Sequence, residues 1–329
     1  MNAEIISRIL TQYGYADYTL LPLEKGYRNE SHPFRLPNDQ TLNFILYKQE
    51  PGILRLIKNA DRSANFASAA GLPARQTVGN KIVKLHTGEW LRYGKIYTYL
   101  PGHTIPWEAY TQEHIKLLGK TLSDLHKSLG PLETAEYPLV ADQYFTIITR
   151  MDKYFSSHGV QEALKNKLEI QIPSSLHSFK RILQGTKHLG HQQVLHMDFV
   201  RGNLLFTNSD EIAISGILDF EKTAVGHPLF DIARTLAFLL VDCKYKTDQQ
   251  IRKYFLRSGY IRRGTQTFYD VTIRDTERSY SLLEVLVTLF LFYDFYKFLR
   301  HNPYESLYEN EHFIRTKSLL LQDGLIHKA

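Results

Sequence analysis

The sequence predicts an α+β protein with two lobes: a small antiparallel-sheet lobe over residues 1–102 and a larger, mainly helical lobe over residues 103–329. Three observations predict this organisation. Short apolar runs separated by turn signals fill most of the first hundred positions. Apolar residues at helical spacing dominate the rest of the chain. Between the two regions, a strand-like run ends in Pro101-Gly102, a pair that interrupts regular structure.

The composition is that of an ordinary globular protein. Of the 329 residues, 43% are hydrophobic and 22% are charged, which is sufficient for one large or two moderate cores. The 40 basic and 34 acidic residues give a formal charge of +6. Because the basic residues are scattered along the chain, we expect no nucleic-acid partner.

Cysteine content and hydropathy suggest the cellular compartment. Cys243 is the single cysteine, so no internal disulfide forms, and we expect a buried thiol in a reducing cytoplasm. Residues 1–10 contain Glu4 and do not resemble a signal peptide. The longest apolar stretch, residues 285–293, is too short to cross a bilayer, so we expect no membrane partner. The sequence gives no indication of oligomeric state.

The first lobe is predicted to begin with a helix over residues 4–15, where isoleucines and a leucine recur at helical spacing. A polar turn at residues 25–31 follows. Pro33 lacks the N–H that a central strand position needs, which favours an edge strand or a bulge and leaves the hairpin register open. The strand predicted over residues 42–47 leads directly to Lys48.

The first lobe continues with a helix predicted over residues 53–70. This helix is followed by Gly71-Leu72-Pro73, a strong stop signal. A hairpin is then expected from residues 82–85 and 90–93, and a further strand over residues 96–100 leads to the lobe boundary.

The second lobe is predicted to open with a helix over residues 112–129, whose apolar residues fall on one face. Residues 131–187 add further helices, broken at Pro138 and Pro173. Beyond residue 240 the pattern is again helical and rich in aromatic residues, which favours a helix-bundle core over a cage for a quaternary ammonium group.

Residues 194–221 contain the most informative pattern in the chain. Two short apolar runs each lead into a polar loop, which predicts strands that present side chains at their ends. The first loop carries His196, Asp198 and Asn203, and the second begins at Asp219. Each loop therefore presents a carboxylate.

This spacing suits phosphoryl transfer, a reaction that depends on placement more than on covalent chemistry. One carboxylate steers the proton of the attacking hydroxyl, and an oxygen-rich set holds the metal that bridges the phosphates. His196, Asp198, Asn203 and Asp219 follow, in order, the pattern H-x-D-x-x-x-x-N plus a separate metal-binding Asp found in kinases.

The segment resembles the catalytic core of the aminoglycoside phosphotransferase and choline kinase family, small-molecule kinases with a protein-kinase-like fold. Met197 stands where protein kinases carry Arg, and Asp219-Phe220-Glu221 stands where they carry Asp-Phe-Gly. Both differences favour the small-molecule branch. The resemblance runs from about residue 20 to 238 and is strongest over residues 194–234.

The resemblance implies the roles of the catalytic and metal-binding residues. Asp198 is expected to be the catalytic base. Asn203, Asp219 and Glu221 are expected to bind Mg²⁺, which prefers hard oxygen ligands. The implied cofactor is ATP, with GTP as the less favoured alternative.

The resemblance also implies a nucleotide site between the lobes. The polar turn covers the phosphates, Lys48 contacts them, and the hinge at residues 99–102 binds adenine. The family normally holds its lysine with a Glu from the next helix, but here Asp61 is the only carboxylate within that helix. Asp61 is expected either to pair with Lys48 or to face solvent. The complete expected set is Gly26, Asn29, Ser31, Lys48, Asp61, Tyr99 and Leu100.

Two further residues are expected to be architectural. His126 lies in a Leu-His pair that resembles the end of a family helix, and it is expected to lie near the catalytic loop. Asp231 is expected to cap a helix or to accept hydrogen bonds from backbone N–H groups of the catalytic loop.

The predicted function is transfer of the γ-phosphoryl group of ATP to a hydroxyl of a small molecule, with the nucleotide and the acceptor as partners. A protein Ser/Thr kinase-like enzyme and a nucleotide-binding pseudokinase are the alternatives. The acceptor stays open among an amino alcohol, a sugar and an aminoglycoside-like polycation. A polycation needs an acidic pocket, to which Glu305, Glu309 and Glu311 are the candidate contributors.

Overall fold

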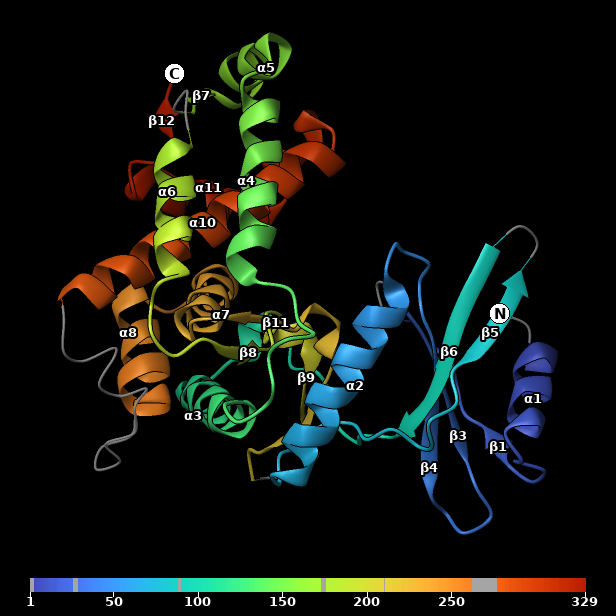
Figure 1. Cartoon of the computed structure of the whole chain (residues 1–329). Helices are drawn as coiled ribbons and strands as arrows, with labels where there is room; N and C mark the ends of the chain where they lie inside the picture. Colours follow the sequence, from blue (N-terminus) through green and yellow to red (C-terminus); the bar gives the residue numbers. More distant parts are fainter. Residues whose placement is uncertain (1–2, 26–28, 88–89, 173–175, 210, 262–276) are drawn as a thin grey trace.

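The computed structural model shows a sheet-containing part packed against a larger helical part (Figure 1). The structure describes residues 3–25, 29–87, 90–172, 176–209, 211–261 and 277–329. Among these residues, no helix is long and apolar enough to cross a membrane.

The first part is built on a six-stranded antiparallel sheet in the order β1-β3-β4-β6-β5, with β2 also paired with β3. Pro33 lies in regular register opposite Asn43, so the hairpin contains no bulge at this position. The strands are β1 (Thr19–Leu20), β2 (Glu24–Lys25), β3 (Glu30–Arg35), β4 (Thr41–Leu46), β5 (Val83–Thr87) and β6 (Trp90–Thr98).

The two strands predicted at residues 90–93 and 96–100 form the single strand β6, so this boundary prediction was wrong. Gly94 lies where the two predicted strands were separated, and a Cβ at this position would collide with the ring of Phe44. Gly94 thus marks close packing within a continuous strand and does not mark a break.

The sheet is covered by a helix on each face, because alternate residues of β4 point to opposite sides. Phe44 packs with Ile6 and Ile9 of α1 (Ala3–Gln12). On the other face, Ile45 belongs to a cluster that includes Ile57 of α2 (Ile53–Ala69). Figure 1 shows α2 between the sheet and the helical part, with α1 on the far side of the sheet.

The helical part begins with α3, which matches the helix predicted over residues 112–129, and most of its helices contribute to one continuous core. Its helices are α3 (Gln112–Leu129), α4 (Val140–Phe155), α5 (His158–Leu168), α6 (His177–Thr186), α7 (Leu229–Asp242), α8 (Asp248–Arg252), the π-helix η4 (Lys253–Tyr260), α10 (Glu277–His301) and α11 (Glu311–Gln322). The 3₁₀ segments are η1 (Trp107–Ala109), η2 (Arg201–Asn203), η3 (Phe220–Lys222) and η5 (Tyr304–Glu309).

Short antiparallel pairs carry the predicted polar loops. The pairs are β8 (Gln193–Leu195) with β11 (Ala224–Gly226), β9 (Leu204–Phe206) with β10 (Ile214–Ile217), and β7 (Ile170–Gln171) with β12 (His327–Lys328). The first two pairs place both predicted catalytic loops at neighbouring strand ends.

The link between the two parts is fixed by backbone contacts. The N–H of His103 donates to the carbonyl of Phe206, and the N–H of Phe206 donates to the carbonyl of His103. Gly102 has φ +136° and lies so close to Ser215 that a Cβ would collide with its side chain. Glycine is therefore required at this position for both backbone conformation and space. The boundary at residue 102 itself remains a prediction.

Candidate active site

The loop after β8 is held by a buried carboxylate from α7. Asp231 accepts hydrogen bonds from the backbone N–H groups of His196 (2.8 Å) and Met197 (2.6 Å), and its Oδ2 lies 3.1 Å from Nε2 of His126. Met197 has φ +61°, a conformation that costs free energy unless its surroundings enforce it. The architectural roles predicted for Asp231 and His126 are confirmed.

His196 is a neutral scaffold residue inside this loop. Its Nε2 lies 3.0 Å from the carbonyl of Leu218, and its Nδ1 accepts from the backbone N–H of Asp198. The ring therefore carries its proton on Nε2. Complete burial lowers its pKa, which is consistent with a neutral ring. His196 thus links the loop that carries Asp198 to the strand end that precedes Asp219.

Asp198 lies at the centre of a small charged cluster. Its Oδ2 is 2.7 Å from Nζ of Lys222, its Oδ1 is 3.2 Å from Nη2 of Arg234, and Nδ2 of Asn203 donates to Oδ2 at 3.0 Å. Burial opposes ionisation, but Lys222 and Arg234 more than offset it and lower the pKa of Asp198 to about 2. The carboxylate is therefore ionised at neutral pH and can accept a proton.

The predicted metal-binding residues fit a hard cation. Asn203 directs its Nδ2 to Asp198, so its Oδ1 has no hydrogen-bond partner among the described residues. Oε2 of Glu221 is buried and likewise has no hydrogen-bond partner there. Burial and the neighbouring Glu221 raise the pKa of Asp219, because two close carboxylates resist simultaneous ionisation. Such a set gains from a divalent cation, and oxygen donors are what Mg²⁺ prefers.

Asp61 is buried and lies in an ion pair with the sheet. Nζ of Lys95 is 2.6 Å from its Oδ2, and the hydroxyl of Tyr97 donates to its Oδ1 at 2.8 Å. Lys95 and Tyr97 are two residues apart on β6, so both point to the face that α2 covers. The sequence prediction was therefore wrong in both of its forms, since Asp61 neither pairs with Lys48 nor faces solvent.

Lys48 takes no part in this ion pair. The preceding residue, Tyr47, is fully buried beneath α2 in the cluster that contains Ile45, whereas Lys48 is exposed. The alternation of side chains along an extended chain explains why the two residues diverge. Lys48 lines the large pocket described below, and its contact with phosphates stays a prediction.

A second buried ion pair connects the sheet side to the loop that is predicted to bind the metal. Nη2 of Arg75 lies 2.8 Å from Oε1 of Glu221 and 3.2 Å from the hydroxyl of Tyr47. The Tyr47 hydroxyl in turn lies 2.5 Å from that of Tyr97. Burial opposes ionisation of Glu221, but Arg75 offsets this and lowers its pKa. A continuous polar network therefore runs from Asp61 on α2 to Glu221.

The predicted phosphate-covering turn is only partly described. Gly26 lies outside the described residues. Oδ1 of Asn29 accepts from the backbone N–H of Lys48 at 3.0 Å, and the Ser31 hydroxyl hydrogen bonds to the side chain of Asn43. Asn29 thus connects the turn to the end of β4, and its predicted contact with the nucleotide remains untested.

The predicted hinge residues Tyr99 and Leu100 follow directly after the end of β6. Both are half-buried, and the Tyr99 N–H donates to the carbonyl of Thr41 at 3.4 Å. The hinge therefore lies between the sheet and the His103–Phe206 connection, as an adenine-binding hinge requires. Binding of adenine there stays a prediction.

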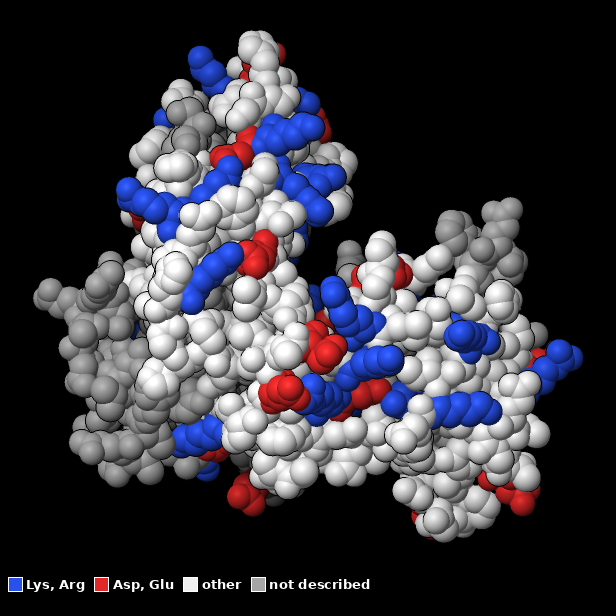
Figure 2. All heavy atoms as spheres, in the orientation of Figure 1, with Lys and Arg blue, Asp and Glu red and all other residues white. Residues whose placement is uncertain are grey.

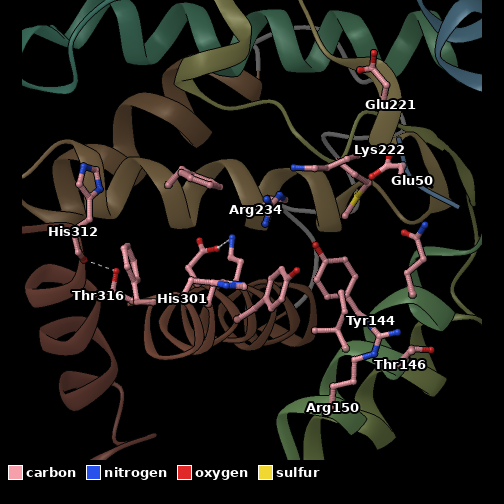
Figure 3. Close-up of a pocket in the computed structure, with 18 of the residues that line it drawn as sticks. Glu50, Tyr144, Thr146, Arg150, Glu221, Lys222, Arg234, His301, His312 and Thr316 are labelled. Atoms are coloured by element: carbon pink, nitrogen blue, oxygen red, sulfur yellow. Dashed lines mark hydrogen bonds and ion pairs between the residues drawn. The ribbon is translucent and has the colours of Figure 1, made fainter. Parts of the chain in front are cut away.

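A pocket of about 1060 Å³ opens beside the catalytic cluster. Figure 2 shows an indentation between the two parts, with charged side chains of both signs near its floor. In Figure 3, Glu221, Lys222 and Glu50 lie towards one end, and His312 lies at the other. The lining comes mainly from α4, α7, α10 and α11 and from the segments around Lys48 and Glu221. Lys222 and Arg234, the two cations that contact Asp198, belong to this lining, and the pocket is large enough for a small molecule.

The C-terminal aromatic residues form core and pocket wall together. Phe290, Phe292 and Phe295 are fully buried, as the predicted helix-bundle core requires. Tyr293 and Phe298 are partly buried and line the pocket.

The acidic cluster proposed for a polycationic acceptor does not line this pocket. Glu305, Glu309 and Glu311 are exposed. Glu305 pairs with Lys167, and Glu311 pairs with Lys244. The cluster is therefore surface charge.

The single cysteine behaves as predicted. Cys243 is buried, and burial raises the pKa of its thiol to about 12, so it is not a thiolate at neutral pH.

Sequence reasoning missed several residues that complete the site. Lys222 was detectable, because it follows the Asp-Phe-Glu motif directly. Lys95 and Arg75 were not, because nothing in their local sequence distinguishes them from surface cations. Arg234 lies one turn after Asp231 on α7, and only the packing of that helix directs it towards Asp198.

Comparison with known proteins agrees with this geometry. Residues 19–257 match the model of the phosphotransferase enzyme family, which confirms the resemblance seen in the motifs. A hydroxylysine kinase from Danio rerio is 25% identical over 240 residues, which is 63% of this chain and 64% of that protein. The match thus spans less than two thirds of that relative's length.

Solved structures confirm the predicted fold. A microcompartment-associated aminopropanol kinase superimposes with a TM-score of 0.66 at 15% identity, covering 98% of this chain and 99% of that chain. An amicoumacin kinase in complex with AMP-PNP and Ca²⁺ gives a TM-score of 0.63 at 11% identity, covering 97% and 96%. At these identities the likeness concerns the fold alone.

Proposed function

Because this chain belongs to the phosphotransferase enzyme family, we propose that it is a small-molecule kinase that transfers the γ-phosphoryl group of ATP to an alcohol. The observation that carries the proposal is the Asp198 cluster, an ionised carboxylate beside two cations at the edge of the large pocket. The acceptor hydroxyl would lie against Asp198, and Lys222 and Arg234 would stabilise charge that develops nearby.

The chain's own residues would act mainly by positioning. Asp198 orients the hydroxyl and accepts its proton late, since its low pKa makes it a weak base for an alcohol in the ground state. Asn203, Asp219 and Glu221 would hold Mg²⁺. When bound, the ion would supply positive charge that offsets the negative charge of the phosphates. Arg75 would fix the direction of Glu221, and Lys48 would contact the phosphates from the rim of the pocket.

ATP is the proposed nucleotide, bound between the hinge at residues 99–102 and the turn that contains Asn29 and Ser31. Relatives of known structure bind AMP-PNP in some cases and GDP in others, so GTP is the alternative to test. We further propose that residues 1–102 form the nucleotide-binding lobe and residues 103–329 the catalytic and acceptor-binding lobe. We place the protein in the cytoplasm, on the basis of its single cysteine.

The names of the relatives favour an amino alcohol as acceptor. Hydroxylysine, aminopropanol and ethanolamine kinases are named for compounds that carry a hydroxyl and an amino group. These small-molecule relatives give no support to the protein-kinase alternative. The pseudokinase alternative finds no support either, because Asp198, Asn203 and Asp219 are all present in the arrangement described above.

The test is an acceptor-dependent ATP-consumption assay with Mg²⁺ over amino alcohols, hydroxy amino acids, sugars and aminoglycosides. The Asp198→Asn variant should lower kcat by about 10² or more while it still binds AMP-PNP, because general-base groups contribute on this scale. Lys153→Gln, an exposed change on α4 outside the pocket, is the control and should behave as wild type. Absence of turnover with every acceptor, together with absence of nucleotide binding, would refute the kinase assignment.

A further inference from the structure

The π-helix η4 packs directly against α3. It is 8 residues long, and its last turn closes with a hydrogen bond of 2.8 Å from the N–H of Ile261 to the carbonyl of Leu256, five residues earlier. π-helical turns are rare and occur frequently at functional sites. In Figure 1 this helix continues α8 and lies beside α3. The unusual helix therefore borders the helix that carries His126.

Two glycines bring η4 and α3 into close contact. A Cβ on Gly119 of α3 would lie 2.7 Å from the backbone N of Tyr260, and a Cβ on Gly259 would lie 3.0 Å from Cα of Gly119. A side chain at either position would push the two helices apart. Tyr260 is thereby held against α3, where it is only 1% exposed.

The Tyr260 hydroxyl is connected to the catalytic loop through two side chains. It lies 2.8 Å from Nδ1 of His126, and Nε2 of the same ring lies 3.1 Å from Oδ2 of Asp231. Because a carboxylate can only accept, the neutral ring carries its proton on Nε2, and its Nδ1 accepts from the hydroxyl. The hydroxyl therefore fixes both the tautomer and the rotation of the His126 ring.

The direction of the Asp231 carboxylate matters for Asp198. Asp231 accepts hydrogen bonds from the backbone N–H groups of His196 and Met197, and Met197 has φ +61°. This conformation persists only where the surroundings enforce it. In its other tautomer, the His126 ring would turn a lone pair towards Oδ2 and repel the carboxylate. Because Asp198 follows Met197 directly, a shift of this loop would move the proposed base.

We propose that Tyr260 is a positioning residue for the phosphoryl transfer, which acts through His126 and Asp231 to hold the loop that carries Asp198. This inference rests on the proposed kinase function and adds to it a residue that does not line the pocket. A phenylalanine would fill the same apolar space, and a buried hydroxyl costs free energy unless its hydrogen bond is made. The hydroxyl is therefore the part of the side chain to which we assign the positioning.

The first measurement needs no acceptor. Hydrogen exchange of the full chain is followed by mass spectrometry in peptides that cover residues 194–200. Tyr260→Phe removes only the hydroxyl, and we expect the His196 and Met197 amides to exchange about tenfold faster, because Asp231 no longer holds them in one geometry. Tyr137→Phe is the matched control, since Tyr137 is also buried and its hydroxyl lies 2.9 Å from that of Ser63. It should leave these amides at wild-type rates.

The second measurement follows the reaction. Turnover is measured with ATP and Mg²⁺ on hydroxylysine, aminopropanol and ethanolamine. Tyr260→Phe should lower kcat about tenfold for every compound that the wild type phosphorylates, because small misplacements of catalytic groups have effects of this size or larger. The Kd of AMP-PNP should not change, since Tyr260 does not line the pocket. Tyr137→Phe should leave both values unchanged.

A double-mutant cycle shows whether Tyr260 acts through His126. The side-chain amide of His126→Gln can donate to Asp231 without a choice of tautomer. In the His126→Gln background, Tyr260→Phe should therefore have little further effect on kcat or on exchange of the loop, because the ring that the hydroxyl orients is absent.

Wild-type exchange of the loop in Tyr260→Phe would overturn the proposal. An equal acceleration in Tyr137→Phe would also overturn it, because that result indicates a general loss of stability. Independent effects of the two changes in the cycle would do the same. Failure of the kinase assignment has a different signature: the wild type phosphorylates none of the compounds, while the effect of Tyr260→Phe on hydrogen exchange is still present.

Discussion

Replacement of Asp61 by Asn should destabilise the protein by removing the partner of a buried cation. Lys95 is only 5% exposed and lies 2.6 Å from the carboxylate. Removal of one member of a buried ion pair typically costs about 3–5 kcal/mol, because the other charge is left without compensation. The new amide oxygen can still accept from the Tyr97 hydroxyl, so we expect a loss near about 3 kcal/mol, the lower end of that range.

A double-mutant cycle with Lys95→Met measures this coupling. The double variant should recover much of the stability lost in Asp61→Asn, with a coupling energy of about 2–3 kcal/mol. The assay is urea unfolding followed by circular dichroism. Lys48→Met is the matched control, because Lys48 is exposed, and its change should stay within about 0.5 kcal/mol. The reasoning fails if the two single changes are additive, or if Lys48→Met costs as much as Asp61→Asn.

Three further predictions follow from the site. Asp219→Ala should abolish most of the Mg²⁺ dependence of AMP-PNP binding in calorimetry, and an unchanged dependence would argue against its role as a ligand. Arg75→Met should weaken Mg²⁺-dependent AMP-PNP binding and lower unfolding stability by about 3 kcal/mol, because Glu221 loses its buried partner; unchanged stability in urea would contradict this. Burial lowers the pKa of His227 to about 4 from 6.5, so its neutral form is favoured by folding. This contribution to the free energy of unfolding is complete above about pH 6.5. It decreases by up to about 3 kcal/mol as the pH falls towards 4. The His227→Asn variant should therefore show a flatter pH–stability curve between these two values.

The catalytic loops were predictable because their geometry is local. His196, Asp198 and Asn203 lie within eight positions on one strand–loop–strand unit, so their spacing in sequence nearly determines their spacing in space. The same holds for Asp219 and Glu221 at the end of the next hairpin. Asp231 was predictable in its role because it opens a helix that directly follows these loops.

The ion pairs that support the site were not predictable, because they depend on contacts between distant elements. Lys95 and Asp61 are separated by 34 positions, and Arg75 and Glu221 by 146. The first pair forms only once α2 packs on the sheet, and the second only once the segment after α2 packs against the end of β10 and η3. A lysine after a strand was the main local signal, and it indicated Lys48, which is exposed and takes no part in the ion pair with Asp61.

The position of Lys95 has a consequence for how nucleotide binding affects the first lobe. In a kinase whose phosphate-binding lysine also holds the neighbouring helix, one cation serves both partners. Here α2 is held by Lys95, and Lys48 has no ion pair among the described residues. If Lys48 contacts the phosphates, it does so without giving up a carboxylate, and the nucleotide need not compete with Asp61. The orientation of α2, and through Tyr97, Tyr47 and Arg75 that of Glu221, therefore does not depend on Lys48.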